Sequence, residues 1–247
     1  MKTKIIILAA GKGTRMGSEL PKALVPLQGK AMISHLIESV VASAVDECPV
    51  VVVSPDNKEI ISQTLSRYNC DYAIQEQQLG SGHAVACARN YIPADTDNVI
   101  VLYCDHPFVT ADSISKFGLF NTEAVTIMPT ELGDYNDWHQ NFFHWGRIVR
   151  DKNNEVEKIV EFKDSSAEEI NITEVNPGFM CFNNQWLWKN IDKLSNDNGP
   201  KEYYLTALVE IAFKQGYKVG TINIEPQEAM GINSREELAI AESLINQ

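Results

Sequence analysis

A glycine-rich segment with three cations in or near it has the clearest chemical meaning in this chain of 247 residues. Residues 8–17 read Leu-Ala-Ala-Gly-Lys-Gly-Thr-Arg-Met-Gly and continue directly from an apolar run. Glycines in such a loop let backbone N–H groups turn inward and form a nest for an anion such as a polyphosphate. The cations are Lys12, Arg15 and Lys22, and Pro21 restricts the backbone just before the last of them. These residues predict a phosphate-binding site near the start of the chain.

Neither of the two common phosphate-binding motifs fits this segment. The G-x-G-x-x-G motif of dinucleotide-binding folds requires a glycine where this chain has Met16. A P-loop requires its Gly-Lys pair to be followed by Ser or Thr, but Gly11-Lys12 is followed by Gly13. A plain tight turn with solvated charges is the alternative interpretation. The cations and the preceding apolar run favour the phosphate site.

Asp105 is a second candidate, because it closely follows the apolar run Asn98–Tyr103. A carboxylate beside a triphosphate is repulsive unless a cation lies between them. Mg²⁺ suits this position, since it prefers hard oxygen ligands and takes one or two from the protein and the rest from phosphates and water. An aspartate here also suits a cap or turn before residues 107–112. The residue alone leaves both interpretations open.

These residues would be positioned by an α/β fold. Apolar runs alternate with amphipathic segments over the first half of the chain, which predicts a doubly wound, mostly parallel sheet with helices on both faces. Such sheets bind ligands at the carboxyl ends of their strands, where the glycine-rich segment and Asp105 fall. The expected strands are Lys4–Ala9, Val50–Val53, Asp71–Ile74, Asn98–Tyr103 and Ala124–Met128, and the expected helices are Met32–Ala44, one N-capped by Asp56, Gly82–Tyr91 and Ser113–Phe120.

The second half of the chain lacks the regular alternation of apolar runs and amphipathic segments. Residues 130–145 are polar and aromatic and predict a loop or lid, which we call the lid. No linker divides the chain, so we expect a single domain over residues 1–247. The remaining expected elements are a β-hairpin over Arg147–Arg150 and Glu155–Phe162, a strand over Glu174–Phe182, and helices over Asn184–Leu194, Glu202–Gln215 and Ser234–Asn246, the last with a capping box at Ser234 and Glu237.

Composition narrows the functional class. A formal net charge of -12 argues against a nucleic-acid binder, which needs a basic face. The longest apolar run, Ile5–Ala10, is far shorter than the roughly 18 residues of a membrane helix, and the N-terminus lacks the pattern of a signal peptide. The five cysteines are widely spaced without any C-x-x-C, which favours free thiols over a disulfide framework or zinc site. We therefore expect a cytoplasmic protein.

Leu8–Met16 and Leu20–Leu24 together resemble the signature L-x-x-G-x-G-T-R-M…P-K-x-L of the sugar-1-phosphate nucleotidyltransferases. Within that family the chain most resembles the uridylyltransferase domain of the bifunctional N-acetylglucosamine-1-phosphate uridylyltransferase/glucosamine-1-phosphate acetyltransferase. The resemblance implies a Rossmann-like fold of the nucleotide-diphospho-sugar transferase type, without the β-helix acetyltransferase domain. It also implies a nucleotide-binding half and a sugar-binding half with the lid. The nucleotide-binding half is residues 1–128, and the sugar-binding half is residues 129–247. The further segments that match the family are residues 75–84, 103–105, 145–148, 160–164, 174–178, 202–206 and 231–235.

The activity implied by the resemblance is transfer of a nucleotidyl group from UTP to N-acetylglucosamine-1-phosphate or a related hexosamine phosphate, releasing pyrophosphate, with Mg²⁺ as cofactor. No general base is needed, because the second pKa of a phosphate monoester is about 6. The implied catalytic residues are Arg15, Lys22 and Asp105; the metal ligands Asp105 and Asn233; the nucleotide contacts Leu8, Ala9, Ala10, Gly11, Lys12, Gly13, Gln75, Gly80, Ser81 and Tyr103; and the sugar contacts Gly146, Glu161, Asn176, Tyr204 and Thr206.

The chain differs from the family near the sugar. Cys104 stands where the family has Gly, residues 176–178 read Asn-Pro-Gly instead of Asn-Thr-Gly, and a longer lid ends in Trp145 where Tyr is usual. A guanylyl- or cytidylyltransferase acting on a different sugar or alditol phosphate is therefore one alternative, and a catalytically silent nucleotide or sugar-phosphate sensor is another. The expected partners are an NTP and a sugar-1-phosphate, with no nucleic acid and no membrane.

Overall fold

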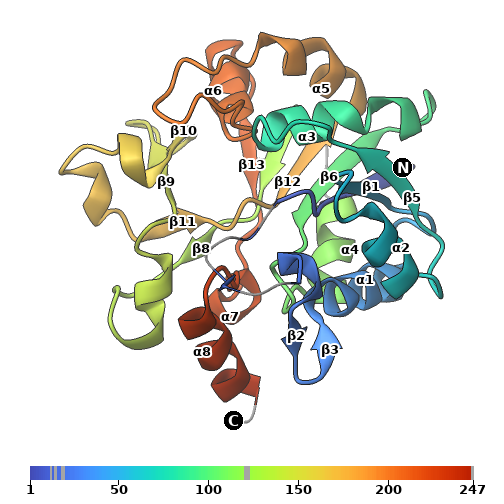
Figure 1. The fold of residues 1–247 in the computed structure, drawn as a ribbon. Coiled ribbons are helices and arrows are strands. Elements are labelled where there is room, and N and C mark those ends of the chain that lie inside the picture. Colours follow the sequence, from blue (N-terminus) through green and yellow to red (C-terminus); the bar gives the residue numbers. More distant parts are fainter. Residues whose placement is uncertain (12, 14–15, 18–19, 120–122, 246–247) are drawn as a thin grey trace.

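The computed structural model describes residues 1–247 except 12, 14–15, 18–19, 120–122 and 246–247. Its centre is a seven-stranded sheet (Figure 1). The strands, in order across the sheet, are β13 (Val219–Thr221), β7 (Val125–Ile127), β12 (Met180–Asn183), β6 (Asn98–Tyr103), β1 (Thr3–Leu8), β4 (Val50–Val53) and β5 (Asp71–Ile74). Only β12 runs antiparallel to its neighbours, β6 and β7. The predicted mostly parallel sheet is confirmed.

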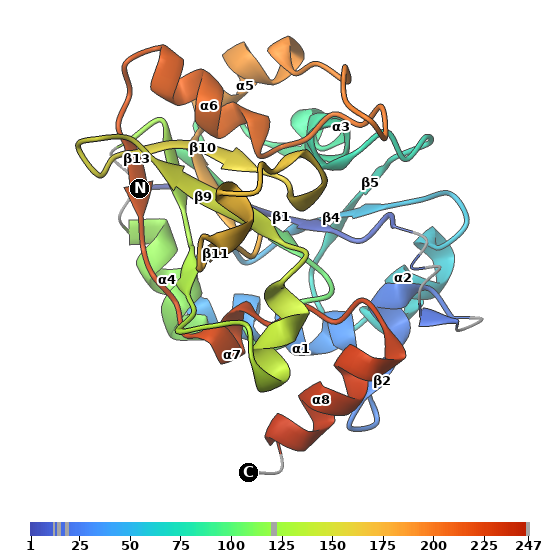
Figure 2. The same cartoon turned by 90° about the vertical axis from the view of Figure 1, so that its left-hand side faces the viewer.

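Helices cover both faces of this sheet (Figure 2). Because side chains alternate along a strand, Ile5 and Ile7 of β1 pack into one buried cluster and Ile6 and Leu8 into another. The first cluster includes side chains of α1 (Met32–Ser43), α2 (Lys58–Thr64) and α4 (Ala111–Leu119), and the second includes side chains of α3 (Ser81–Cys87), α5 (Asn184–Asn190) and α6 (Ala207–Lys214). The result is the three-layer arrangement of a doubly wound fold.

A second sheet of four antiparallel strands lies beside the first (Figure 1). The predicted hairpin is confirmed in it, with Asn154 in the left-handed region at φ 64° in the turn. The lid contains a short 3-10 helix, η4 (Asp137–Phe142), where we expected a loop. The four strands, in order, are β10 (Val156–Val160), β9 (Gly146–Arg150), β11 (Glu174–Asn176) and β8 (Thr130–Glu131).

The single strand expected over Glu174–Phe182 is wrong. The chain forms two strands there, β11 and β12, and they belong to different sheets. The break falls at Pro177, which has no N–H to donate, and at Gly178, whose φ of +100° favours glycine. A Cβ on Gly178 would lie 2.7 Å from Cε2 of Tyr103, so the chain passes the carboxyl end of β6 too closely for any side chain.

Two expected helix starts are also wrong. Helix α2 begins at Lys58, and Asp56 does not cap it; the residue before the helix, Asn57, instead accepts a hydrogen bond from the N–H of Ser54 at 2.9 Å. Helix α6 begins at Ala207 rather than Glu202. The residues before it run along α3, where the N–H of Gly82 donates to the carbonyl of Tyr203 at 2.8 Å.

The last helix, α8 (Arg235–Ile245), has the predicted capping box. Ser234 Oγ accepts from the N–H of Glu237 at 3.2 Å, and Glu237 Oε2 accepts from the N–H of Ser234 at 3.1 Å. The helices expected at Gly82–Tyr91 and Asn184–Leu194 each end in a 3-10 turn, η3 (Arg89–Tyr91) and η7 (Ile191–Lys193). Elements that we did not predict are β13, the pair β2 (Pro26–Leu27) and β3 (Lys30–Ala31), η2 (Lys22–Leu24), η5 (Phe162–Asp164), η6 (Glu169–Asn171) and α7 (Pro226–Ala229).

Two expectations from composition are met within the described residues. No helix in them is both long enough and apolar enough to cross a bilayer. All five cysteines are free thiols; Cys104 and Cys181 are buried, and the other three are partly exposed.

Candidate active site

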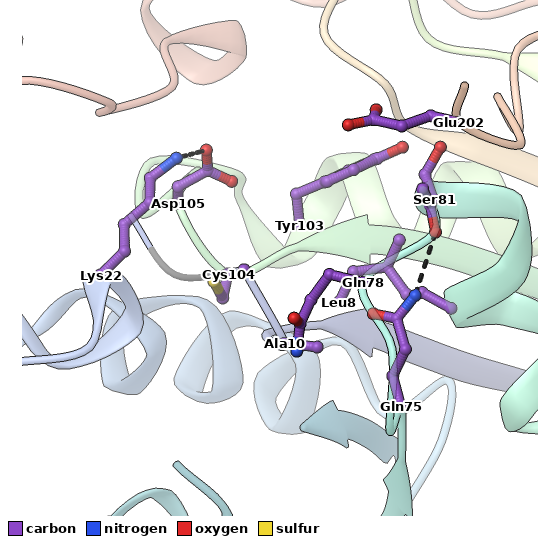
Figure 3. Close-up of a pocket in the computed structure, with 13 residues that line it drawn as sticks. Leu8, Ala10, Lys22, Gln75, Gln78, Ser81, Tyr103, Cys104, Asp105 and Glu202 are labelled. Carbon is purple, nitrogen blue, oxygen red and sulfur yellow. Dashed lines mark hydrogen bonds and ion pairs between the residues drawn. The ribbon is translucent and has the colours of Figure 1, made fainter. Parts of the chain in front are cut away.

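A cavity of about 240 Å³ opens at the carboxyl ends of β1, β5 and β6 (Figure 3). Strand pairing sets Leu8 beside Tyr103, and Gln75 follows the end of β5. The cavity is lined by nine of the residues predicted for the nucleotide or for catalysis: Leu8, Ala10, Gly11, Lys22, Gln75, Gly80, Ser81, Tyr103 and Asp105. It is also lined by four residues that we did not predict: Gln78, Ala84, Cys104 and Glu202.

Some predicted nucleotide contacts are not among the lining residues. Ala9 is buried, and its N–H donates to the carbonyl of Val52 at 2.8 Å. Its carbonyl accepts from Nδ2 of Asn57 at 2.9 Å, so both of its backbone groups are used within the fold. Lys12 and Arg15 lie outside the described residues, and their predicted roles stay predictions.

Gly13 lies beside the cavity and determines how closely the loop approaches Lys22. Its φ is +61°, and a Cβ on it would lie 2.4 Å from Cβ of Lys22. Only glycine allows both this backbone conformation and this contact. Lys22 follows Pro21 and begins η2, whose other residues, Ala23 and Leu24, are buried in the core. The loop and η2 therefore fix the backbone from which the Lys22 side chain extends.

Lys22, Asp105 and Asn233 meet at one end of the cavity, although they are far apart in the sequence. The Lys22 ammonium forms an ion pair with Oδ2 of Asp105 and donates to Oδ1 of Asn233 at 2.6 Å (Figure 3 shows the ion pair). The N–H of Asn233 donates to Oε2 of Glu237, which holds its backbone at the start of α8. The structure therefore brings together the predicted cation and both predicted metal ligands.

The electrostatics of Asp105 favour its ionised form. Burial alone would raise the pKa of this carboxyl, but the Lys22 ammonium and the adjacent His106 ring outweigh burial and hold the pKa well below its usual value. His106 is buried, with Nδ1 3.3 Å from Oδ1 of Asp105. These contacts therefore favour the carboxylate form of Asp105.

The donor set fits a magnesium ion. Asp105 and Asn233 present two hard oxygens to one cation, here the ammonium of Lys22. Within the described ranges no three His, Cys, Asp or Glu side chains gather to hold a metal. A site of one carboxylate and one amide is typical of Mg²⁺ that is completed by phosphates and water.

A second cavity, of about 280 Å³, adjoins the first. Ser81 and Tyr103 line both cavities, so these two side chains form a shared wall. Tyr204, a predicted sugar contact, is not among the lining residues. The predicted sugar contacts that line it are Gly146, Glu161, Asn176 and Thr206, together with Asn233, and the residues that we did not predict are Asn141, His144, Trp145, Pro177, Gly178 and Glu237.

Glu161 is a partly exposed acid that lines this second cavity. Its carboxylate accepts a hydrogen bond from the Thr206 hydroxyl at 2.9 Å. Burial raises the pKa of Glu161, and the hydrogen bond only partly opposes this. Gly146 lies beside this carboxylate: a Cβ there would be 3.6 Å from Oε2 of Glu161, an ordinary contact, and 3.0 Å from Cγ2 of Ile159. A carboxylate held in this way is a strong acceptor for sugar hydroxyls.

Gln75 is buried beside the first cavity, and its amide is oriented by the protein. Nε2 donates to the carbonyl of Gly80 at 3.1 Å and lies 3.0 Å from Nδ1 of His83. The side-chain oxygen is on the opposite side of the amide (Figure 3). Because these two contacts occupy the amide N–H groups, Oε1 is the atom that Gln75 offers to a base.

The sequence profile of the MobA-like NTP transferase domain family matches residues 5–204. The chain belongs to this family. It is similar to three proteins named bifunctional protein GlmU, from Clostridium novyi (strain NT), Clostridium tetani (strain Massachusetts / E88) and Caldicellulosiruptor saccharolyticus (strain ATCC 43494 / DSM 8903 / Tp8T 6331). The identities are 39%, 38% and 40%, over 99%, 97% and 98% of this chain and 52%, 51% and 51% of the relatives. This NTP transferase domain thus spans about half the length of the curated relatives it matches.

The residues of the nucleotidyltransferase that sequence reasoning missed fall into two groups. The first group lies in segments that already resembled the family, so the sequence could have identified its members as site residues. These are Gln78, Cys104 and Glu202. Asn141 and Glu237 carried no such signal, since one lies in an irregular lid and the other was read only as a helix cap. Tertiary packing alone brings them to the second cavity.

Proposed function

We propose that residues 1–247 form one nucleotidyltransferase domain that transfers a uridylyl group from UTP to a sugar-1-phosphate, N-acetylglucosamine-1-phosphate or a related hexosamine phosphate, and releases pyrophosphate. Residues 1–128 supply most of the nucleotide site, and residues 129–247 supply most of the sugar site and the lid. The observation that carries the proposal is the pair of adjoining cavities, which share Ser81 and Tyr103 and have Lys22, Asp105 and Asn233 beside them.

The reaction needs the two substrates side by side. A phosphate oxygen of the sugar-1-phosphate attacks the α-phosphorus of the triphosphate, and the bond from that phosphorus to the bridging oxygen of the β-phosphate breaks. The nucleophile is already an anion near neutral pH. The protein therefore has to orient both substrates and neutralise their charge rather than remove a proton. Adjoining cavities with a shared wall support such an arrangement.

Charge neutralisation falls to the cations near the first cavity. Lys22 would contact the phosphates, and we assign the same role to Arg15. Asp105 and Asn233 would hold Mg²⁺, which neutralises phosphate oxygens when bound. Lys22 contacts both of these residues, so the oxygens that would hold the metal now pair with its ammonium. The same ammonium would be available to a phosphate if these two oxygens took up a cation.

The base preference rests on Gln75. An amide oxygen accepts hydrogen bonds, and uracil presents an N3–H donor on its Watson–Crick edge, whereas the matching nitrogens of cytosine and adenine are acceptors. The fixed orientation of Gln75 is complementary to uracil N3–H and supports UTP. The exocyclic amino groups of cytosine and adenine are donors too, so Gln75 alone does not separate the four bases. Guanine also presents a donor, N1–H, which keeps GTP as the second candidate.

A matrix of the four nucleoside triphosphates against several sugar and alditol phosphates, with pyrophosphate release as the readout, tests this proposal. We expect the highest kcat/KM with UTP and an N-acetylhexosamine phosphate, and a requirement for Mg²⁺. A strong preference for GTP or CTP would overturn the uridylyl assignment. Tight nucleotide binding without turnover for every pair would instead support a sensor.

A further inference from the structure

The lid is held by a buried arginine. Arg147 has no exposed surface, and its guanidinium donates to the backbone carbonyls of Phe143, at 2.7 Å, and Trp145. It also donates to the carbonyl of Ile170, at 3.2 and 3.3 Å. No carboxylate in the described parts of the chain forms an ion pair with it. The hydrogen bonds of the guanidinium therefore join the end of the lid to the segment that follows β10.

Aromatic rings surround the same guanidinium. Its carbon lies 5.0 Å from the ring centre of Tyr135 and 5.7 Å from those of Phe143 and Phe162. Cation–π contacts of this kind strengthen when they are shielded from water. The lid thus wraps around Arg147, and its residues have defined positions relative to the second cavity.

Asn141 is the lid residue with an unused polar group. It lies in η4 next to Phe142, which is fully buried and packs 4.7 Å from Trp145, ring centre to ring centre. Nδ2 of Asn141 is buried and has no hydrogen-bond partner in the described structure. The residue lines the second cavity. Buried polar groups in native proteins are almost always paired, so this amide points to a partner that arrives with the ligand.

The second cavity therefore offers a bound molecule both kinds of hydrogen-bonding group. Glu161 supplies an acceptor, and Asn141, whose Nδ2 has no partner in the described structure, is the donor that we assign to the same cavity. We propose that Asn141 determines acceptor specificity by donating a hydrogen bond from Nδ2 to an oxygen of the sugar-1-phosphate. The proposal rests on the proposed function, because it takes the second cavity to be the acceptor site. Together, Glu161 and Asn141 would select sugar phosphates that place a hydroxyl toward Glu161 and a hydrogen-bond-accepting oxygen toward the lid.

The test compares Asn141→Ala and Asn141→Asp with Gln140→Ala, the preceding exposed residue of the same short helix. Loss of one hydrogen bond in Asn141→Ala should lower kcat/KM for the acceptor about tenfold. Asn141→Asp keeps the shape but replaces the donor with a carboxylate, so its loss should be larger. The KM for UTP should stay at the wild-type value in all three variants, and the Tm should do so in Asn141→Ala and Gln140→Ala, which excludes a general folding defect.

The acceptor panel identifies the oxygen involved. A loss larger for N-acetylglucosamine-1-phosphate than for glucose-1-phosphate indicates the acyl carbonyl, and an equal loss indicates a hydroxyl or the phosphate. Wild-type kcat/KM for every acceptor in Asn141→Ala would overturn the inference. If the wild-type protein turns over no pair of substrates, the proposed function fails; calorimetry with the same sugar phosphates then decides, since the inference requires weaker binding to Asn141→Ala.

Discussion

The backbone N–H of Ile232 donates a hydrogen bond to the backbone carbonyl of Asp105, with 2.8 Å between nitrogen and oxygen. This bond attaches the segment before α8 to the end of β6. A Cβ on Gly231 would lie 2.8 Å from Nε2 of His106, so the two segments approach as closely as glycine allows. Asn233 follows directly, and this contact is what brings its side chain to Asp105 and Lys22.

The carboxylate of Asp105 is the first group to test. Asp105→Asn keeps the shape of the side chain but removes its charge, so the variant holds a divalent cation poorly and leaves Lys22 without its counter-charge. We expect pyrophosphate release to fall at least about 100-fold while the fold survives. Asp112→Asn, an exposed aspartate paired with Lys116, is the matched control. Wild-type turnover in Asp105→Asn would remove this residue from the mechanism.

Glu161→Gln tests the effect of this carboxyl group on the pH dependence of stability. Because burial raises the pKa of Glu161, the folded state holds its proton more tightly than the unfolded chain does. Stability is therefore lost as pH rises above the usual value of 4.5 and through the raised pKa. Glutamine does not titrate and still accepts from Thr206. The variant should have a higher Tm than the wild type at neutral pH and a higher KM for the acceptor.

The Tm difference should close as the pH falls through the raised pKa and below 4.5, where Glu161 becomes neutral in both the folded and the unfolded state. Glu157→Gln, in the same strand β10 but outside the cavity lining, should follow the wild type. A constant Tm difference at every pH would mean that the ionisation of Glu161 is not its cause.

Arg147→Met tests the link between the lid and the rest of the protein. Methionine removes the buried charge but leaves the carbonyls of Phe143, Trp145 and Ile170 without their donor. Unpaired buried carbonyls should lower the free energy of unfolding by at least about 2 kcal/mol, a fall in Tm of about 4–8 °C for a chain of this size. Differential scanning calorimetry measures it. An unchanged Tm would show that the lid does not depend on this arginine.

Arg235→Ala tests how the glycine-rich loop is held. Nε of Arg235 donates to the carbonyl of Met16 at 3.0 Å, and Nη2 donates to that of Gly17 at 2.7 Å. Without these bonds the loop should order less readily around a triphosphate, raising the KM for UTP about threefold to tenfold. The neighbouring exposed residue provides the control, Glu236→Ala. Equal KM values in both variants would contradict this role.

The sheet was predictable because its strands are short apolar runs with clear ends. Val50–Val53, Asp71–Ile74 and Asn98–Tyr103 have the same bounds in the sequence prediction and in the structure. The strand prediction failed at Glu174–Phe182, which Pro177 and Gly178 interrupt and whose two ends join different sheets. The Pro-Gly pair is a local signal for the break, whereas the change of sheet depends on the backbone at Gly178 and its contact with Tyr103.

The site was predictable only in part. The residues themselves pointed to Lys22 and Asp105, the resemblance to the family supplied Asn233, and the structure brings these three together. No spacing rule pairs residues so far apart in the sequence. They meet because the hydrogen bond between Ile232 and Asp105 brings Asn233 to the end of β6. Asn141 could not be found from the sequence, since its role follows from where Arg147 holds the lid.

The wall formed by Ser81 and Tyr103 has a consequence for the end of the catalytic cycle. Because these side chains line both cavities, the nucleotide sugar that the proposed reaction forms would fill the two spaces at once. We therefore expect the finished product to compete with each starting compound separately. Synthesis would then slow as the nucleotide sugar accumulates, without any additional regulatory site.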